Sequence, residues 1–267
     1  MLENSAVPYD VIAVRYATVD VSSSALFAHY SAYREPDRIR RMDYYFWVLS
    51  RPEHVVVVDT GFDPHVGSRR GRTLLISPEE ALRELCVDAA SVSQVILTHF
   101  HYDHVGNWGL FPSAQFFASG DEMRFWASTY SRKAVPSDAV ELGELSALKT
   151  LAKAGRLSAV EEGSEIAPGI QMLELPGHTP GQLGVSVSSG SCRVILASDA
   201  AHFYDEFELD MPFHIFTDIV QMYKSLERLR VLASEPDSVV VPGHDPEIAE
   251  RFPARYAGRN QHLFQIG

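Results

Sequence analysis

Runs of apolar residues along the chain predict strands and helices in two successive halves. Short β-branched and apolar runs bounded by turn residues are the pattern of strands. The predicted strands cover residues 10–19, 44–49, 54–59, 95–98, 115–118, 170–175, 183–187, 193–197 and 239–241. The second and third of these flank Arg51-Pro52-Glu53, which predicts a hairpin.

Helices are predicted between and after these strands. Ser77 followed by Pro78 and Glu80 is typical of a helix start, because the serine caps the first turn and the acid reaches back to it. Residues 218–233 have the apolar spacing of an amphipathic helix, and 120–157 form a helical insertion that we expect to act as a cap. This order predicts an α/β fold with two mixed sheets packed face to face and helices outside, an αββα sandwich.

Composition narrows the classes of protein. The chain has 267 residues and no linker rich in Gly, Ser and Pro, so we expect a single domain over 1–267. Its net charge of −12, with no Lys/Arg run, argues against a nucleic-acid partner. No signal peptide or apolar run of membrane-spanning length is present, which predicts a cytoplasmic protein without a membrane partner. We expect Cys86 and Cys192 to be buried free thiols.

The histidines are unevenly placed. His99, His101 and His104 lie within six residues, with Asp103 among them, directly after a predicted buried strand. Three further candidates also follow predicted strands, where functional residues are often positioned: His178, Asp199 and His244.

These residue types favour a transition-metal site. Imidazole and carboxylate groups suit Zn, Fe, Mn or Co, whereas Ca and Mg prefer oxygen ligands alone. A catalytic ion usually takes three protein ligands, so five histidines and two carboxylates are too many for one ion. They suit two divalent ions that share one bridging carboxylate.

The motif His99-x-His101-x-Asp103-His104 resembles that of the metallo-β-lactamase superfamily, as do the later Gly-His, Asp and Gly-His positions and the turn at Asp59-Thr60-Gly61. The resemblance covers residues 44–250. Ser198–Tyr204, Pro212-Phe213 and Pro242–Pro246 make the chain most similar to the N-acyl-homoserine lactonase branch.

The resemblance implies a role for each ligand. His99, His101 and His178 would hold one ion, most often zinc. Asp103, His104 and His244 would hold the other, and Asp199 would bridge the two. Asp59 would support a ligand histidine.

The implied reaction is the opening of a lactone ring, such as that of an N-acyl-homoserine lactone in quorum quenching. Asp103 would pass a proton to the leaving alkoxide. Many relatives carry a tyrosine three residues after the bridging aspartate, whereas this chain has His202, which would contact the substrate instead. Further expected substrate contacts are Tyr102, Phe62, Phe213 and Tyr204.

Three alternatives stay open from the sequence. The first is another hydrolase of this fold, acting on a thioester, β-lactam or phosphoester. The others are a dioxygenase with one iron and a binding protein without catalysis. Residues 20–41, which include Phe27, Tyr30 and Tyr33, would cover the pocket or form a homodimer contact through exposed aromatics.

Overall fold

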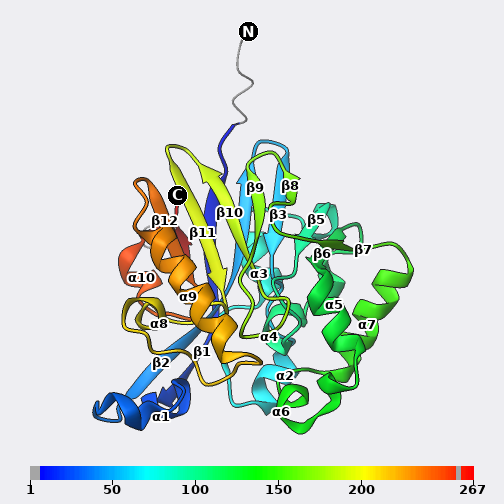
Figure 1. Ribbon diagram of the computed structural model, residues 1–267. Coiled ribbons are helices and arrows are strands. Elements are labelled where there is room, and N and C mark those ends of the chain that lie inside the picture. Colours follow the sequence, from blue (N-terminus) through cyan, green and yellow to red (C-terminus); the bar gives the residue numbers. More distant parts are fainter. Residues whose placement is uncertain (1–6, 257–259) are drawn as a thin grey trace.

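Two β-sheets pack face to face in the computed structural model, which describes residues 7–256 and 260–267 (Figure 1). The expectation about a signal peptide falls partly on residues 1–6, outside the described residues. The first sheet has the order β13 (Ala254–Tyr256), β14 (Asn260–Gln265), β1 (Asp10–Ser22), β2 (Ile39–Arg51), β3 (His54–Val58), β5 (Gln94–Ile96), β6 (Gln115–Ser119) and β7 (Leu157–Val160), with β4 (Thr73–Leu74) paired to β1. The second has the order β12 (Ser238–Pro242), β11 (Cys192–Ser198), β10 (Leu183–Ser189), β9 (Ile170–Glu174) and β8 (Glu165–Ala167).

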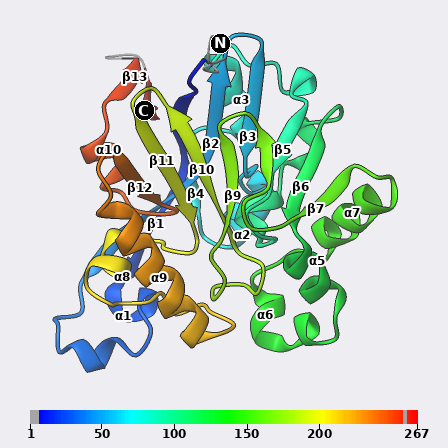
Figure 2. The ribbon, with the colours of Figure 1, turned by 45° about the horizontal axis from the view of Figure 1, so that its top comes forward.

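Helices cover the outer faces of both sheets (Figure 2). The long helix α9 (Ile219–Ala233) packs against β12, and α3 (Pro78–Glu84) packs against β1. Beside β6 and β7 lie α5 (Gly120–Ala127) and α7 (Leu142–Lys153). The shorter helices are α1 (Ser23–Leu26), η1 (Tyr30–Tyr33), α2 (Pro64–Arg69), η2 (Ala89–Ser91), α4 (Tyr102–Val105), η3 (Trp108–Leu110), η4 (Tyr130–Arg132), α6 (Ala134–Asp138), α8 (Tyr204–Glu208) and α10 (Ile248–Arg251). The predicted αββα sandwich is therefore confirmed.

Strand direction places several strand ends at one edge of the sandwich. Strands β3, β5, β6 and β7 run parallel, as do β11 and β12. In such sheets the loops that follow the carboxyl ends of parallel strands form the binding crevice. The chain enters these loops from rigid, apolar strands, since Val57, Val95 and Leu196 are fully buried in a core shared by the two sheets.

Several local predictions are also confirmed. β2 and β3 form the expected antiparallel hairpin. Ser77 and Glu80 form a reciprocal capping box at the start of α3. β5 ends at Ile96, two residues before the predicted end, because the Thr98 N–H donates to the Asp59 carboxylate at 2.8 Å rather than to a neighbouring strand.

Two expectations about burial are wrong. The thiols are free, but Cys86 is exposed because the chain leaves α3 through a left-handed turn there (φ 57°), and Cys192 is half-buried at the start of β11. Phe27 is not an exposed aromatic: it is 1% exposed and packs against Phe203 at a ring distance of 5.6 Å. None of the helices in the described ranges is long and apolar enough to cross a bilayer.

Candidate metal centre

Four loops bring the predicted ligands together at one edge of the sheets. His99 and the short helix α4 follow β5, His178 follows β9, and Asp199 and His244 follow β11 and β12. All seven predicted ligand residues are at most 7% exposed. Residues that are far apart in the sequence therefore form a compact polar cluster inside an apolar scaffold.

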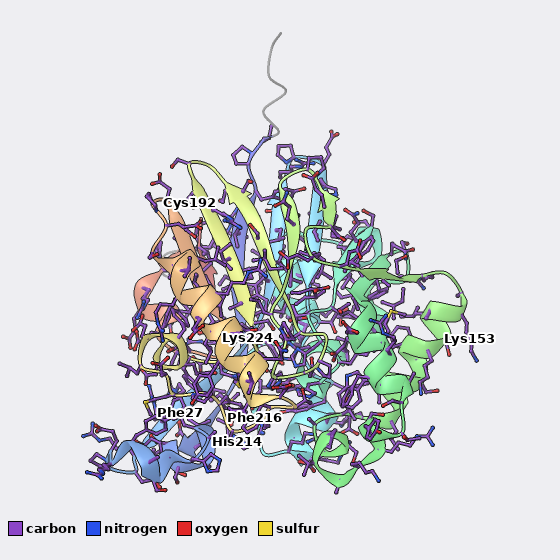
Figure 3. All side chains as sticks on the ribbon, viewed as in Figure 1. Phe27, Lys153, Cys192, His214, Phe216 and Lys224 are labelled. Carbon is purple, nitrogen blue, oxygen red and sulfur yellow. The ribbon has the colours of Figure 1, made fainter. Side chains whose placement is uncertain are left out.

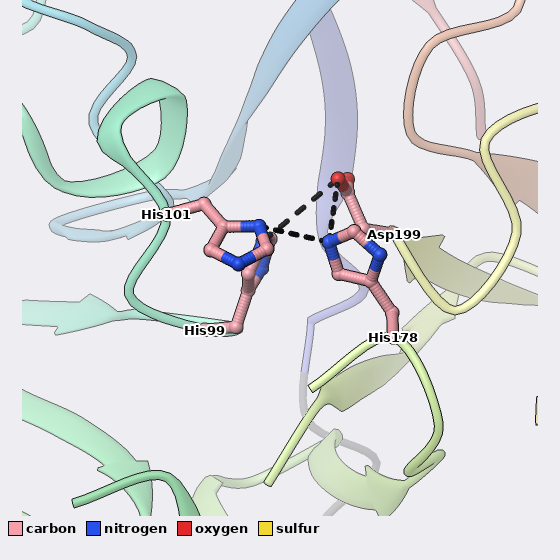
Figure 4. Close-up of side chains that lie close together, drawn as sticks. All are labelled: His99, His101, His178 and Asp199. Carbon is pink, nitrogen blue, oxygen red and sulfur yellow. Dashed lines mark hydrogen bonds and ion pairs between the residues drawn. The ribbon is translucent and has the colours of Figure 1, made fainter. Parts of the chain in front are cut away.

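One group of ligand atoms comes from His99, His101, His178 and Asp199, and lies within a span of 4.8 Å (Figure 4). His178 Nε2 is 2.9 Å from His101 Nδ1 and 3.4 Å from Asp199 Oδ2. His99 Nε2 approaches the same carboxylate oxygen at 3.8 Å. Two imidazoles thus approach one oxygen of Asp199, and His101 contacts one of them, His178.

A second group of ligand atoms comes from Asp103, His104 and His244, also within 4.8 Å of one another. The other oxygen of Asp199, Oδ1, lies 3.2 Å from His104 Nε2 and 3.1 Å from His244 Nε2. Asp199 therefore stands between the groups and faces each with a different oxygen, which is the arrangement of a bridging carboxylate.

Unpartnered atoms in this cluster fit cation binding. Nε2 of His99, His104 and His244 and Oδ1 of Asp199 are buried and have no hydrogen-bond partner among residues 7–256 and 260–267. Buried polar atoms without partners are costly, and a bound cation would satisfy all four. The donor set is imidazole and carboxylate, which suits transition-metal ions.

Hydrogen bonds outside the cluster orient the imidazoles. Nδ1 of His178 contacts the Ile215 carbonyl at 2.8 Å, and Nδ1 of His244 contacts the Asp43 carbonyl at 2.8 Å. Nδ1 of His104 contacts the carboxylate of Asp59 at 2.8 Å. When Nδ1 donates to an oxygen, the lone pair of Nε2 is left free to face the centre.

The fold and this cluster agree with a family match. The family model described as "Metallo-beta-lactamase superfamily" matches residues 41–244, which include all seven predicted ligands. The chain belongs to the metallo-β-lactamase superfamily.

Similar proteins within the superfamily are named as lactonases. The N-acyl homoserine lactonase AiiA of Bacillus thuringiensis subsp. kurstaki is 24% identical over 227 residues, 79% of this chain and 85% of the relative. A solved N-acyl homoserine lactone hydrolase with N-hexanoyl-L-homoserine bound at its catalytic metal centre has a TM-score of 0.75 at 19% identity, covering 93% of this chain and 98% of that one. The structure of AidC, a dizinc quorum-quenching lactonase, has a TM-score of 0.68 at 21% identity, and the match covers 88% of this chain and 87% of that one.

Burial and nearby charges shift the pKa values of the candidate ligand histidines in different directions. Burial lowers the pKa of His99 and His178 well below the ordinary value and that of His101 to about 4, so these imidazoles are neutral and able to coordinate. Burial also acts on His104, but Asp199, Asp59 and Asp103 outweigh it and raise its pKa well above the usual range. His104 must therefore exchange a proton for any cation that it binds.

His202 lies directly beside the bridging position. Its Nε2 is 3.0 Å from Asp199 Oδ2, and its ring stacks on Phe213 at a centroid distance of 3.6 Å. Burial opposes the charged ring, but Asp199 and Glu206 overcome this and raise the pKa of His202 to about 9. The third close group of candidate ligand atoms is that of Asp199, His202 and His244.

A pocket of about 580 Å³ opens onto the cluster. Figure 3 labels two of its residues, His214 and Phe216, in the connection between α8 and α9. The lining residues are Val21, Ala25, Leu26, Met42, Tyr44, Arg70, Arg72, His101, Tyr102, Asp103, Ala134, Val135, Asp138, Ala139, His178, Asp199, His202, Phe213, His214, Ile215 and Phe216. Residues of the predicted cap therefore reach the pocket through α6.

Three of the five expected substrate contacts line this pocket: Tyr102, His202 and Phe213. Phe62 and Tyr204 do not. Phe62 is fully buried, with the ring of Tyr16 4.9 Å away, and Tyr204 lies under the guanidinium of Arg251 at 3.5 Å. Both rings are buried in this packing, and a substrate contact of Phe62 or Tyr204 stays a prediction.

Sequence reasoning missed two buried glutamates that support the site. Glu122 accepts hydrogen bonds from the N–H of Phe100, next to His101, at 2.9 Å and from the N–H of Gly181, in the loop after His178, at 3.2 Å. Glu206 accepts from the N–H of His202 at 2.5 Å. Each is fully buried, but no local pattern distinguishes it from a glutamate on a helix surface.

Glu144 of α7 leads to a prediction about pH. Burial, followed by the charges of Glu141 and Asp103, raises its pKa to about 8, and its Oε2 has no hydrogen-bond partner in the described part of the chain. Between the unfolded pKa of about 4.5 and the folded pKa of about 8, the unfolded chain loses this proton while the folded chain keeps it. Rising pH over this window therefore destabilises the fold through Glu144.

A Glu144→Gln variant is expected to remove this loss. Its melting temperature, measured by calorimetry with a chelator present, should equal that of wild type near pH 5 and exceed it by several degrees near pH 8.5. Glu227→Gln, at an exposed position of α9, serves as the control and should not change the pH profile. Equal melting temperatures for Glu144→Gln and wild type at both pH values would contradict the assignment.

Proposed function

We propose that this chain is a hydrolase with two divalent metal ions that opens a lactone ring, with an N-acyl-homoserine lactone as the favoured substrate. The observation that carries the proposal is Asp199, whose two oxygens face two separate groups of ligand atoms at the base of a pocket. The lactonase names of similar proteins give the substrate class. The buried core shared by both sheets favours one domain over the whole chain.

The residues that would hold the ions follow the two groups. His99, His101 and His178 would bind one ion, and Asp103, His104 and His244 the other, with Asp199 shared. Zinc is the ion we favour, as in the dizinc relative, with Fe, Mn and Co as other candidates. When bound, such a pair lowers the pKa of water and polarises a carbonyl group.

The chain's own residues bind the lactone and move its protons. Tyr102 and Phe213 both line the pocket and hold the ring and its substituent away from bulk water. His202, which lines the same pocket, donates a hydrogen bond to the carbonyl oxygen. Water adds to the carbonyl carbon and the ring C–O bond breaks. Asp103 takes the proton from the water and delivers it to the leaving oxygen, which gives a hydroxy acid.

A substrate panel tests the proposal. Protein of known metal content is supplied with N-acyl-homoserine lactones, simple γ- and δ-lactones, a thioester, a β-lactam and a phosphoester. We expect proton release from the lactones, followed by pH-stat, to exceed that from the other compounds. Turnover of another compound class alone, or of none, would reject the proposal.

Cytoplasmic location and homodimer formation stay predictions.

His202 gives a second prediction. His202→Phe keeps the stack on Phe213 but removes the polar atoms, so we expect kcat/KM for the lactone to fall by about 10²-fold, the scale of losing one oxyanion donor. His202→Tyr restores a donor and should stay within about tenfold of wild type by the same reasoning. His65→Phe, at an exposed position of α2, is the control. If both His202 variants behave like wild type, the residue makes no contact in catalysis.

A further inference from the structure

We propose that Arg72 makes one wall of the pocket a subsite for a carboxylate, so that a lactone with an anionic group on a short arm binds more tightly than its neutral counterpart. The inference rests on the proposed function and names the substrate class more closely. It depends on how Arg72 is held, on its lack of an acidic partner and on the position of Tyr102.

Arg72 is fixed by its backbone and by its guanidinium. The chain turns through Gly71 at φ 71°, and the Arg72 N–H donates to the Gly67 carbonyl at 2.9 Å. Nε donates to the Tyr102 hydroxyl at 3.1 Å, and Nη1 donates to the Arg70 carbonyl at 2.8 Å. Nη2 has no hydrogen-bond partner in the described ranges, so this edge of the fork is available to a ligand in the pocket.

The charge of Arg72 is not balanced by an acid. In the part of the chain that the structure describes, no carboxylate oxygen lies within 4.0 Å of its guanidinium, whereas Arg70, on the same wall, pairs with Glu141 at 3.0 Å. Arg15, also half-buried, pairs with Asp43 at 3.3 Å. A preorganised guanidinium with free donors is suited to carboxylate recognition.

Tyr102 places this charge close to the reaction. Its hydroxyl accepts from Arg72, and the pocket that both residues line is also lined by the candidate ligands His101 and Asp103. The pocket also has an apolar wall, which includes Phe213, Ile215 and Phe216. In a lactone with a carboxylate on a short arm, the carboxylate would bind Arg72 while the ring carbonyl lies at the candidate metal centre.

Two matched lactones test the subsite. One is a γ-lactone with a carboxymethyl substituent, and the other carries a carbamoylmethyl group of the same shape without the charge. We expect metal-loaded wild type to show a KM about tenfold lower for the charged lactone, because a charge-assisted hydrogen bond is roughly twice as strong as a neutral one. Arg72→Met should bring the KM ratio to about one, and Arg72→Lys should recover part of it.

The control is Arg69→Met, because Arg69 is exposed, pairs with Glu141 and does not line the pocket. It should keep the wild-type ratio. In Arg72→Met, a metal content and a melting temperature equal to those of wild type show that the site is intact. A wild-type ratio near one, or a ratio that survives Arg72→Met, overturns the subsite.

A binding measurement separates this proposal from the proposed function. If neither lactone is opened, lactone hydrolysis fails, and calorimetry then uses the ring-opened dicarboxylate and its monoamide with metal-loaded protein. Tighter binding of the dicarboxylate that is lost in Arg72→Met supports the subsite. Equal binding of both compounds rejects it.

Discussion

An Asp199→Asn variant is expected to lose one of the two bound ions and nearly all lactone hydrolysis. The substitution keeps the size of the side chain but removes its charge and replaces one oxygen with an amide nitrogen, which is not a ligand for these ions. Oδ1 faces His104 and His244, while Oδ2 faces His178, so one group of ligands must lose its shared oxygen. The losses of metal affinity and of lactone hydrolysis should exceed the roughly 10–100-fold effect of changing a residue that only supports a ligand.

Metal analysis and kinetics check this expectation together. Asp199→Asn protein, dialysed beside wild type, should retain about one ion per chain, the stoichiometry of a single catalytic site. Asp121→Asn changes an exposed aspartate of α5 in the same way and should keep wild-type metal content and activity. Two ions and full activity in Asp199→Asn would show that Asp199 does not bridge.

A Glu122→Leu variant is expected to be strongly destabilised and to bind metal more weakly. Oε1 accepts from the Phe100 N–H at 2.9 Å and from the Trp126 indole at 2.6 Å, and Oε2 accepts from the Gly181 N–H at 3.2 Å. Leucine leaves these three donors buried without acceptors, at about 1–3 kcal/mol for each. We expect the free energy of unfolding to fall by about 3 kcal/mol or more by the same principle.

The metal effect is specific to one group of ligands. Phe100 precedes His101, and Gly181 lies three residues after His178, so Glu122 ties together two loops that supply the same candidate ion. Metal affinity there should fall about 10–100-fold. Glu227→Leu, exposed on α9, should change stability by less than about 0.5 kcal/mol. Urea unfolding and a metal titration measure both quantities, and unchanged values would contradict the role of Glu122.

The ligand-bearing loops were predictable because their signals are local. His99, His101 and His104 follow a short apolar strand, and both the residue types and the strand pattern can be recognised from the sequence alone. The hairpin and the cap of α3 at Ser77 are also local patterns, and the structure has both. The αββα layers followed from the order of strands and helices together with the family resemblance.

The supporting residues were not predictable because their roles depend on distant contacts. From the sequence, Glu206 has the pattern of a helix surface residue, but in the structure it accepts a hydrogen bond from the backbone of His202. Arg72 has the pattern of a turn residue, but in the structure it lines the pocket. The burial of the aromatic residues was not predictable for the same reason. Phe62 is near the motif, but three-dimensional packing places it in the core.

The most direct test of the central claim is a zinc titration of metal-free protein in which bound metal and lactone opening are measured on the same samples. We predict that two ions bind per chain, as the two groups of ligand atoms require, and that opening of an N-acyl-homoserine lactone appears as the second ion binds. A chain that holds a single iron, or one that binds two ions and opens no lactone, would contradict the account.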